Sequence, residues 1–508
     1  MAGQDRIEQA RLEKLSRLIN RGIDPYPHKF QRTHSNIEAI ALYPELISAN
    51  TPAVMPVMRL AGRITAIRFM GKAAFFDIRD GSGKVQVFFR RDSLGEDKYA
   101  VLHDFDLGDF LGAEGVLFTT RSSEITLEAS DFTILAKSLL PLPEKWHGLV
   151  DVEKRYRQRY LDLISNDDVK DLFIKRSKII NAIRSFMNAG GFIEVETPVL
   201  QPMYGGALAR PFITHHHALD QDLYPRIALE LYLKRLIIGG FDRVYEIGRV
   251  FRNEGISTRH NPEFTMLESY EAYADYNDVM EMTEKLVSGV ALEVLGTTEV
   301  NFDGESINLA PPWKRLPLRQ SLIDKCGMDF MDYPDADSLR KAMGKLGLQV
   351  DPLKDKGRLI DELLSTFVEP GLKQPTFLID YPIEMSPLAK RHRKEPGLVE
   401  RFEAFICGME IANSFSELND PREQRERFTQ QRQMHAAQVE RARAAGEMPE
   451  TEMIDDDFLT AMEHGMPPTG GLGIGIDRLI MLLTDSQSIR EVILFPQLKT
   501  KSGGVKND

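Results

Sequence analysis

The chain has 508 residues, and its 64 basic and 76 acidic side chains give a net charge of 64 − 76 = −12. This length predicts two or more domains, and 42% hydrophobic with 28% charged residues is typical of a globular protein without a membrane-spanning segment. An acidic balance does not favour nucleic-acid binding unless basic residues are concentrated locally. We expect no secretory signal, because the first residues contain no apolar segment. The two cysteines, Cys326 and Cys407, are too far apart for a cysteine-based zinc site and fit a cytoplasmic location.

Basic side chains recur every three or four residues near the amino terminus, at Arg11, Lys14, Arg17 and Arg21. This spacing places them on one stripe of a helix, beside a second, apolar stripe. Two interpretations stay open at this point. The stripe is either a solvated helix surface or a surface that lies along nucleic-acid phosphates.

Residues 56–138 contain about five short alternating runs separated by turn signals such as Asp80-Gly81-Ser82-Gly83. This pattern predicts an OB-fold barrel, an architecture that binds single-stranded nucleic acid. Phe75 and Phe76 are adjacent, so only one of them can face the interior of a regular strand. The outward ring could stack on an unpaired base, although a single Phe is more often part of a core.

A proline-marked linker and a basic segment follow the barrel, and we place the domain boundary between residues 145 and 146. The next pattern predicts an amphipathic helix over Leu172–Ala189 that ends at Gly190-Gly191, then a strand and Pro198. The run His215, His216, His217 favours a structural or surface role, because consecutive residues of an extended segment point to alternate sides and cannot all chelate one metal.

Two strands joined by a polar loop are predicted between Arg243 and Tyr276. Period-two spacing puts Glu246 and Arg252 on one face of the first strand, and Phe264, Glu268 and Tyr270 on one face of the second. If the strands pair, then an arginine, carboxylates, a phenyl ring and a phenol converge on one surface. That set is suited to a nucleotide: arginine for phosphate, the ring for a base, and carboxylates for amines or metal.

Residues 277–375 show helical patterns and are interpreted as a helical insertion in the catalytic sheet. Near the carboxyl end the run GLGIGIDR leads a strand into a helix, with Asp477 as its expected cap and Arg478 in its first turn. The charged stretch Met434–Asp457 predicts a surface helix.

Several of these stretches resemble the class II aminoacyl-tRNA synthetases. FRNEGISTRHNPEFTMLE closely resembles motif 2 in the form found in bacterial-type lysyl-tRNA synthetases, GLGIGIDR resembles motif 3, and the helix–strand–proline unit resembles motif 1, which forms the homodimer interface of that class. SELND resembles the lysine type rather than the aspartate and asparagine types. The resemblance implies an α+β protein with an N-terminal OB-fold β-barrel domain over residues 1–145. A catalytic domain with a mainly antiparallel sheet flanked by helices would follow over residues 146–508.

The resemblance also implies roles for particular residues. The residues it gives to ATP are Arg252, Glu254, His260, Phe264, Glu403, Glu410 and Arg478, with Arg252 and Arg478 as the catalytic pair. Those it gives to lysine are Gly206, Glu230, Glu268, Tyr270, Asn413, Phe415 and Glu417. Glu403 and Glu410 would hold magnesium, up to three ions per active site. Glu410 lies seven positions after Glu403, and an odd offset puts two side chains on opposite faces of a regular strand. Gly408 must therefore mark a turn or bulge for both to face the metal. The residues it gives to the tRNA anticodon are Arg68, Phe75, Gln86 and Glu124.

The implied function is the activation of L-lysine with ATP, followed by transfer of the lysyl group to the 3′ end of tRNA(Lys) by a cytoplasmic homodimer. The nearest enzymatic alternative is an aspartate- or asparagine-type synthetase. A protein-lysylating relative would lack the N-terminal β module, and a non-catalytic paralogue should have lost Arg252, Glu410 or Arg478. The chain contains the β module and all three of these residues.

Overall fold

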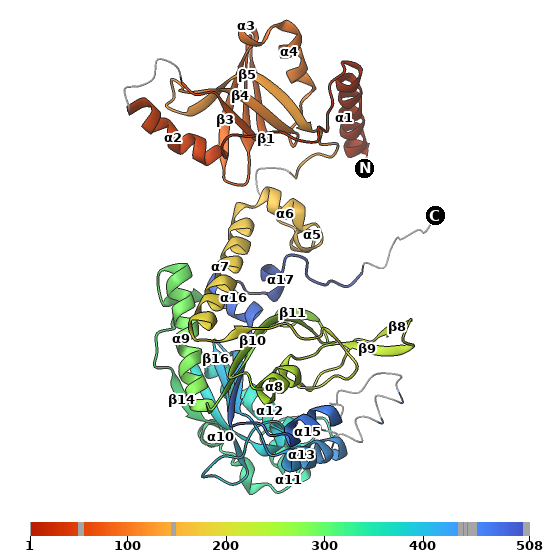
Figure 1. Ribbon diagram of the computed structural model, residues 1–508, viewed down its shortest axis with the longest axis vertical. Coiled ribbons are helices and arrows are strands. Elements are labelled where there is room, and N and C mark those ends of the chain that lie inside the picture. The colour runs from red at the N-terminus through yellow and green to blue at the C-terminus, as the bar shows by residue number, and fades with distance from the viewer. Residues whose placement is uncertain are drawn as a thin grey trace. The chain divides into compact units, whose positions relative to one another are not determined.

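The computed structural model describes residues 2–48, 55–143, 149–352, 354–434 and 455–500, together with the isolated residues 440 and 444. The chain divides into two compact units, Met1–Val150 and Asp151–Asp508, which Figure 1 shows in ribbon form. The expected boundary between residues 145 and 146, and most of the expected helix over Met434–Asp457, lie outside the described residues. Within the described part of the chain, no helix is long and apolar enough to cross a membrane.

The first unit is built on a closed five-stranded barrel with the strand order β1-β2-β3-β5-β4, as predicted. Its strands are β1 (Met58–Met70), β2 (Ala73–Arg79), β3 (Lys84–Arg90), β4 (Phe110–Thr119) and β5 (Ile125–Ala136). Two short helices and a 3₁₀ turn connect β3 to β4: α3 (Arg91–Leu94), α4 (Glu96–Val101) and η1 (Leu102–Asp104). Phe76 is fully buried, whereas its neighbour Phe75 is only partly buried, so the predicted alternation of the two rings is confirmed.

The basic stripe lies on α1 (Ala2–Asn20), and it does not form the free basic surface that one interpretation expected. Arg11 is buried and donates to the carbonyl oxygens of Ser138, Leu140 and Leu107 at 2.8, 2.8 and 3.0 Å. Lys14 pairs with Asp106 at 2.7 Å. Further along the helix, Arg17 pairs with Asp104 at 2.8 Å and Arg21 lies 3.7 Å from the same carboxylate. The stripe therefore fastens α1 to the barrel. A second helix, α2 (Asn36–Ser48), packs against the same unit.

The second unit contains an eight-stranded sheet with the order β14-β15-β16-β17-β18-β11-β10-β6. The strands are β14 (Lys314–Pro317), β15 (Thr376–Pro382), β16 (Leu398–Ile406), β17 (Met409–Ser416), β18 (Thr469–Gly475), β11 (Glu263–Ala272), β10 (Arg243–Phe251) and β6 (Ile193–Glu194). All pairs are antiparallel except the two at the edges, β14 with β15 and β6 with β10. The mainly antiparallel sheet predicted for this part of the chain is confirmed.

Helices cover both faces of this sheet (Figure 1). On one face, α7 (Asp167–Ala189), α9 (Tyr276–Leu295) and α16 (Ile476–Thr484) pack on apolar residues such as Leu267 and Ile474. The other face carries α8 (Glu230–Ile238), whose Leu229 and Leu233 pack on Val244 and Tyr270. Short helices and strands complete the unit: α5 (Val152–Arg157), α6 (Arg159–Ser165), α13 (Pro421–Met434), α15 (Asp456–Glu463), α17 (Ile489–Val492), β7 (Leu200–Gln201), β8 (Thr214–His216) and β9 (Gln221–Pro225).

The stretch 277–375, expected to be a helical insertion, contains both helices and strands. Its elements after α9 are the hairpin β12 (Glu299–Phe302) and β13 (Glu305–Asn308), the edge strand β14, and α10 (Leu318–Cys326), α11 (Ala336–Lys345) and α12 (Lys356–Leu363), followed by short helical turns over Leu364–Gly371. Because α9 covers the sheet and β14 extends it, part of this stretch belongs to the sheet layers.

The expected cap at Asp477 is wrong. The residue before α16 is Gly475, which makes no side-chain cap. Asp477 is buried in the first turn, where it pairs with Arg176 of α7 at 2.5 Å and accepts the backbone N–H of Thr265 at 2.7 Å. Its carboxylate therefore ties α7, α16 and β11 together.

Replacing Arg11 with Ala tests the anchoring of α1. The change removes the Arg11 donor from three carbonyl oxygens in the segments flanking β4 and β5, of which that of Leu140 keeps the hydroxyl of Ser138, and an acceptor left unsatisfied costs about 1–3 kcal/mol where it is buried. We expect the free energy of unfolding of the first unit to fall by about this amount in denaturant titrations. Arg6→Ala, a change at an exposed arginine of the same helix, is the control and should have little effect. Equal stability of the two variants would contradict the anchoring role.

Candidate active site

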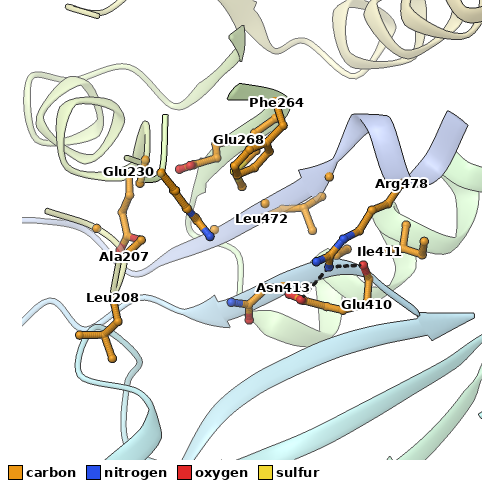
Figure 2. Close-up of a pocket in the computed structure, with 18 of the residues that line it drawn as sticks. Ala207, Leu208, Glu230, Phe264, Glu268, Glu410, Ile411, Asn413, Leu472 and Arg478 are labelled. Carbon is orange, nitrogen blue, oxygen red and sulfur yellow. Dashed lines mark hydrogen bonds and ion pairs between the residues drawn. The ribbon is translucent and has the colours of Figure 1, made fainter. Parts of the chain in front are cut away.

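A pocket of about 450 Å³ opens on the α8 face of the sheet, between β11, β17 and β18 (Figure 2). It brings together thirteen of the fourteen residues that the sequence assigned to ATP and lysine: Gly206, Glu230, Arg252, Glu254, His260, Phe264, Glu268, Tyr270, Glu410, Asn413, Phe415, Glu417 and Arg478. The fourteenth, Glu403, lies outside the lining.

The register of the predicted hairpin explains this convergence. Opposite Glu246 of β10 stands Glu268 of β11, and opposite Val244 stands Tyr270. Beyond the end of β10 the pairing continues, because the N–H of Arg252 donates to the carbonyl of Pro262 at 2.8 Å. Residues of like parity on both strands therefore face α8, as the period-two spacing predicted.

One end of the pocket is acidic. The carboxylates of Glu230, Glu268 and Glu417 are all buried there, and Figure 2 shows Glu230 and Glu268 on the same side of the cavity. Glu268 accepts the N–H of Leu229 at 2.9 Å and the hydroxyl of Tyr270 at 3.1 Å. Burial and the charge of Glu230 raise the pKa of Glu268 to about 7. Such a site favours a ligand that brings positive charge.

A protein cation already lies among these carboxylates. Lys234, one turn after Glu230 on α8, is fully buried and forms ion pairs with both Glu230 and Glu417. The sequence analysis missed this residue. Its signal was a lysine four residues after a glutamate in an otherwise apolar helical run, the spacing at which opposite charges meet on a helix.

Glycines let the carboxylates approach the sheet. A Cβ atom on Gly471 of β18 would lie 1.9 Å from Glu417 Oε1 and 2.7 Å from the ring of Tyr270. Any side chain there would displace the acid. Gly206 has a φ of +83°, and a Cβ on it would lie 3.1 Å from that of Glu230. The glycine-rich run thus leaves space for the buried carboxylates at the acidic end of the pocket. A search for phosphate-binding loops does not reveal this role.

The other end of the pocket carries arginines and an aromatic ring. The Arg252 guanidinium lies 5.3 Å from the centre of the Phe264 ring. Arg478 donates to the side chain of Glu410 at 3.0 Å and to its backbone carbonyl at 2.9 Å, as the dashed lines in Figure 2 show. His260 Nε2 lies 3.3 Å from Arg478 Nη2. Two guanidinium groups and a ring at one wall suit a phosphorylated purine.

Glu403 lies behind the pocket wall. Its two oxygens accept hydrogen bonds from Arg401 at 2.6 Å and from Tyr381 at 2.8 Å, and Arg401, which lines the pocket, also contacts Asn413 at 3.1 Å. Burial raises the pKa of Glu403 to about 7; Glu410 adds to this shift and Arg401 opposes it. The turn that the sequence required between the two acids is present, since Cys407 and Gly408 have φ values of +51° and +63° and the register shifts after Ala404.

The acids alone do not form a complete metal site. Among the described residues, no group of three or more His, Cys, Asp or Glu side chains is arranged to hold a metal ion. Glu403 and Glu410 supply hard oxygen donors, and the charge of Glu410 acts on Glu403. This set fits magnesium, which takes one or two carboxylates and completes its shell with substrate phosphates and water.

The consecutive histidines lie away from this pocket. His215 on β8 pairs with Asp222 of β9 at 2.8 Å, and all three imidazoles are exposed. Their arrangement agrees with the surface role expected from the sequence.

The anticodon candidates are neighbours on the outer face of the barrel. Arg68 contacts Asp77 at 3.1 Å, and Gln86, which is buried, donates to Glu124 at 3.1 Å. Phe75 stacks on Phe88 with ring centres 4.7 Å apart, and Phe118 lies 5.8 Å beyond Phe88. The sequence analysis missed the second and third rings. They are separated along the chain and become a row only when the strands pair.

Comparisons with known proteins agree with this geometry. A family described as tRNA synthetases class II (D, K and N) matches residues 151–499, and an OB-fold nucleic acid binding domain matches residues 58–135. The chain therefore belongs to the class II aminoacyl-tRNA synthetases of the aspartate, lysine and asparagine group.

Curated relatives narrow the family further. The chain is 58% identical to a lysine–tRNA ligase of Dehalococcoides mccartyi over 98% of both proteins. The lysine–tRNA ligases of Pelotomaculum thermopropionicum and Moorella thermoacetica are 53% and 52% identical, over 97% and 99% of this chain and 95% and 99% of theirs. Within the class, the chain belongs to the lysine–tRNA ligase family.

Proposed function

We propose that this protein activates L-lysine with ATP to form lysyl-adenylate and pyrophosphate, and then transfers the lysyl group to the 3′ end of tRNA(Lys). The observation that carries the proposal is a single pocket with three buried carboxylates at one end and two arginines with an aromatic ring at the other. Lysine offers two ammonium groups to the first end, and ATP offers phosphates and adenine to the second.

Activation requires positioning rather than a protein nucleophile. The lysine carboxylate oxygen attacks the α-phosphorus of ATP, a phosphorus–oxygen bond forms, and the bond to the pyrophosphate oxygen breaks as that group leaves with its electron pair. Arg252, beside Phe264, neutralises charge on the α-phosphate and the carboxylate with its planar fork. Arg478 holds the triphosphate from the opposite side, and adenine stacks between Phe264 and Arg478, with Glu254 and His260 at the pocket edge.

Recognition of lysine follows from the cost of buried charge. Glu230 receives the α-ammonium, and Glu268, Tyr270 and Glu417 receive the ε-ammonium. Gly206, Asn413 and Phe415 shape the walls. An amino acid without the second ammonium leaves a buried carboxylate unpaired, which a site of this kind rejects strongly.

Magnesium would be held by Glu403 and Glu410 together with the phosphates of ATP, where it neutralises negative charge. Burial is the main cause of the raised pKa of Glu403, and a cation bound beside it would favour the ionised carboxylate.

The remaining proposals concern partners. The barrel face with Arg68, Phe75, Gln86 and Glu124 binds the anticodon of tRNA(Lys). The α7–β6 unit forms a homodimer interface, for which the exposed apolar side chains of Ile174 and Ile193 are available. A location in the cytoplasm follows from the role in protein synthesis, and both cysteines are free, as a reducing compartment requires.

Pyrophosphate exchange without tRNA, measured across the twenty amino acids, tests the central proposal. Lysine alone should support rapid exchange, and Arg252→Ala should lower the lysine-dependent rate by at least about a hundredfold, because the charge on the α-phosphate is then uncompensated. Arg249→Ala changes a partly exposed arginine of β10, three residues before Arg252, and is the control. Full exchange by Arg252→Ala would remove that residue from the site, and exchange driven by another amino acid would reject the lysine assignment.

Lysine binding should depend on pH through Glu268. Its pKa of about 7 means that the carboxyl is largely protonated below pH 7, whereas an incoming ammonium requires the ionised form. Affinity should therefore rise about tenfold between pH 6 and pH 8 as this one proton is lost. Titration calorimetry with lysine alone, in buffers of different ionisation enthalpy, should detect the release of up to one proton. A flat profile with no release would contradict the assignment.

Phe75→Ala tests the anticodon surface. Base stacking on an aromatic side chain is worth about 1–3 kcal/mol, so the KM for tRNA in aminoacylation should rise about tenfold while pyrophosphate exchange is unchanged. Phe69→Ala, a change at a partly exposed ring of neighbouring β1 that stacks on His103, is the matched control. Parallel losses in both assays would show instead that the Phe75 ring is needed for folding.

A further inference from the structure

Lys234 is an unusual group to find at the base of a substrate pocket. It stands between Leu233 and Arg235 in the middle of α8, is fully buried, and contacts one carboxylate on its own helix and one from a distant part of the chain. Glu230 lies on the same helix, and Glu417 follows β17. A buried ammonium is costly unless it is paired on more than one side, and both pairs are present here.

The surroundings of Lys234 are those proposed for the substrate's own ammonium groups. Its Nζ lies 5.4 Å from the centre of the Phe415 ring and 6.0 Å from that of Tyr270. Glu417 also has an oxygen, Oε1, that is buried and receives no hydrogen bond from any described group. One side of this carboxylate is therefore held by Lys234, and the other is available to a ligand.

Without Lys234 the acidic end of the pocket would hold three buried carboxylates, of which Glu268 senses the charge of Arg252. Neighbouring carboxylates cannot all stay ionised in a buried site, and some of them take up protons instead. Burial and the acids around Glu417 raise the pKa of its carboxyl, and Lys234 is the group that opposes this shift. The two carboxylates in turn raise the pKa of Lys234, so the ammonium stays charged. The charged groups facing it are Glu230, Glu417 and Glu268, with the phenol of Tyr270.

We propose that Lys234 is a positioning residue that orients Glu230 and Glu417 in the empty pocket and keeps Glu417 ionised, so that lysine enters a site already prepared for its two ammonium groups. This inference rests on the proposed lysine activation and adds a residue that does not itself touch the reacting atoms. Three carboxylates with one fixed ammonium leave two negative charges, the number that the two ammonium groups of lysine neutralise.

Two other roles are physically reasonable and predict different behaviour. If Lys234 only fills space, a neutral side chain of similar length would weaken lysine binding equally at every pH. If Lys234 competes with the substrate for Glu417, its removal would strengthen lysine binding, because one like charge has been taken away.

The decisive variant is Lys234→Met, which keeps the length and removes the charge. The freed carboxylates should acquire protons that lysine must displace. We therefore expect the KM for lysine in pyrophosphate exchange to rise at least about tenfold over wild type at pH 6.5, and this ratio to shrink to about threefold or less at pH 8.5. The KM for ATP should stay unchanged. Arg235→Met removes a charge from the next helical position, where Arg235 pairs with Asp455 outside the pocket, and is the matched control.

A constant KM ratio across this pH range, or a KM below that of wild type, would overturn the proposal. A second measurement needs no variant. If Lys234 keeps Glu417 ionised, wild-type protein should release no more than one proton per lysine bound at pH 7, the proton of Glu268. Release of two or more would overturn the proposal even if Lys234→Met failed to fold. Failure of wild type to exchange with lysine would instead reject the proposed function itself.

Discussion

The burial of charge in one sheet is the constraint on which the catalytic unit depends. Three deeply buried acids near the pocket each have a cation from another part of the chain: Arg226 for Glu246, Arg176 for Asp477, and Lys234 for Glu417. Buried ion pairs add little net stability, because desolvation offsets most of the attraction. Breaking one is costly, however, since it leaves a charge without a partner. The pairs therefore fix where strands and helices can sit more than they strengthen the fold, and the pocket keeps its shape for that reason.

The pairing register of the strands also determines where the buried charges of the site lie. A slip of one residue between β10 and β11 would turn Glu268 and Tyr270 toward the apolar face that packs on α9. Two glycines permit this close arrangement. A Cβ on Gly248 would lie 2.1 Å from Arg226 Nη2, and one on Gly471 would lie 1.9 Å from Glu417 Oε1. At both positions the missing side chain leaves room on the face of the sheet for a charged group.

These constraints separate what the sequence could predict from what it could not. Period-two spacing gave the faces of β10 and β11, because alternation is a local property of the backbone. The barrel, the helix ending at Gly190 and the opposite environments of Phe75 and Phe76 follow from equally local rules. Three contacts each join separate segments of the chain: the pairing of Lys234 with Glu417, which follows β17, the row formed by Phe75 with Phe88, and the pairing of Asp477 with Arg176. No local pattern contains such pairs, which is why Asp477 was mistaken for a helix cap. The motifs located the site through resemblance, but they did not reveal which charges compensate one another.

Intramolecular charge pairing also bears on how an acidic chain engages tRNA. The basic stripe of α1 was the most prominent cationic feature of the sequence, yet Lys14 and Arg17 pair with aspartates of the barrel and Arg11 is buried against backbone carbonyls. A cation that is already paired releases few counterions from phosphate, so this helix contributes little long-range attraction. The exposed features of the barrel face are instead the aromatic row and a few arginines that are themselves ion-paired, such as Arg68. Stacking on such rings is short-ranged and depends weakly on salt. Binding of an anticodon to this proposed surface should therefore derive its free energy mainly from unpaired bases placed against the Phe75 row, and only secondarily from the phosphate backbone.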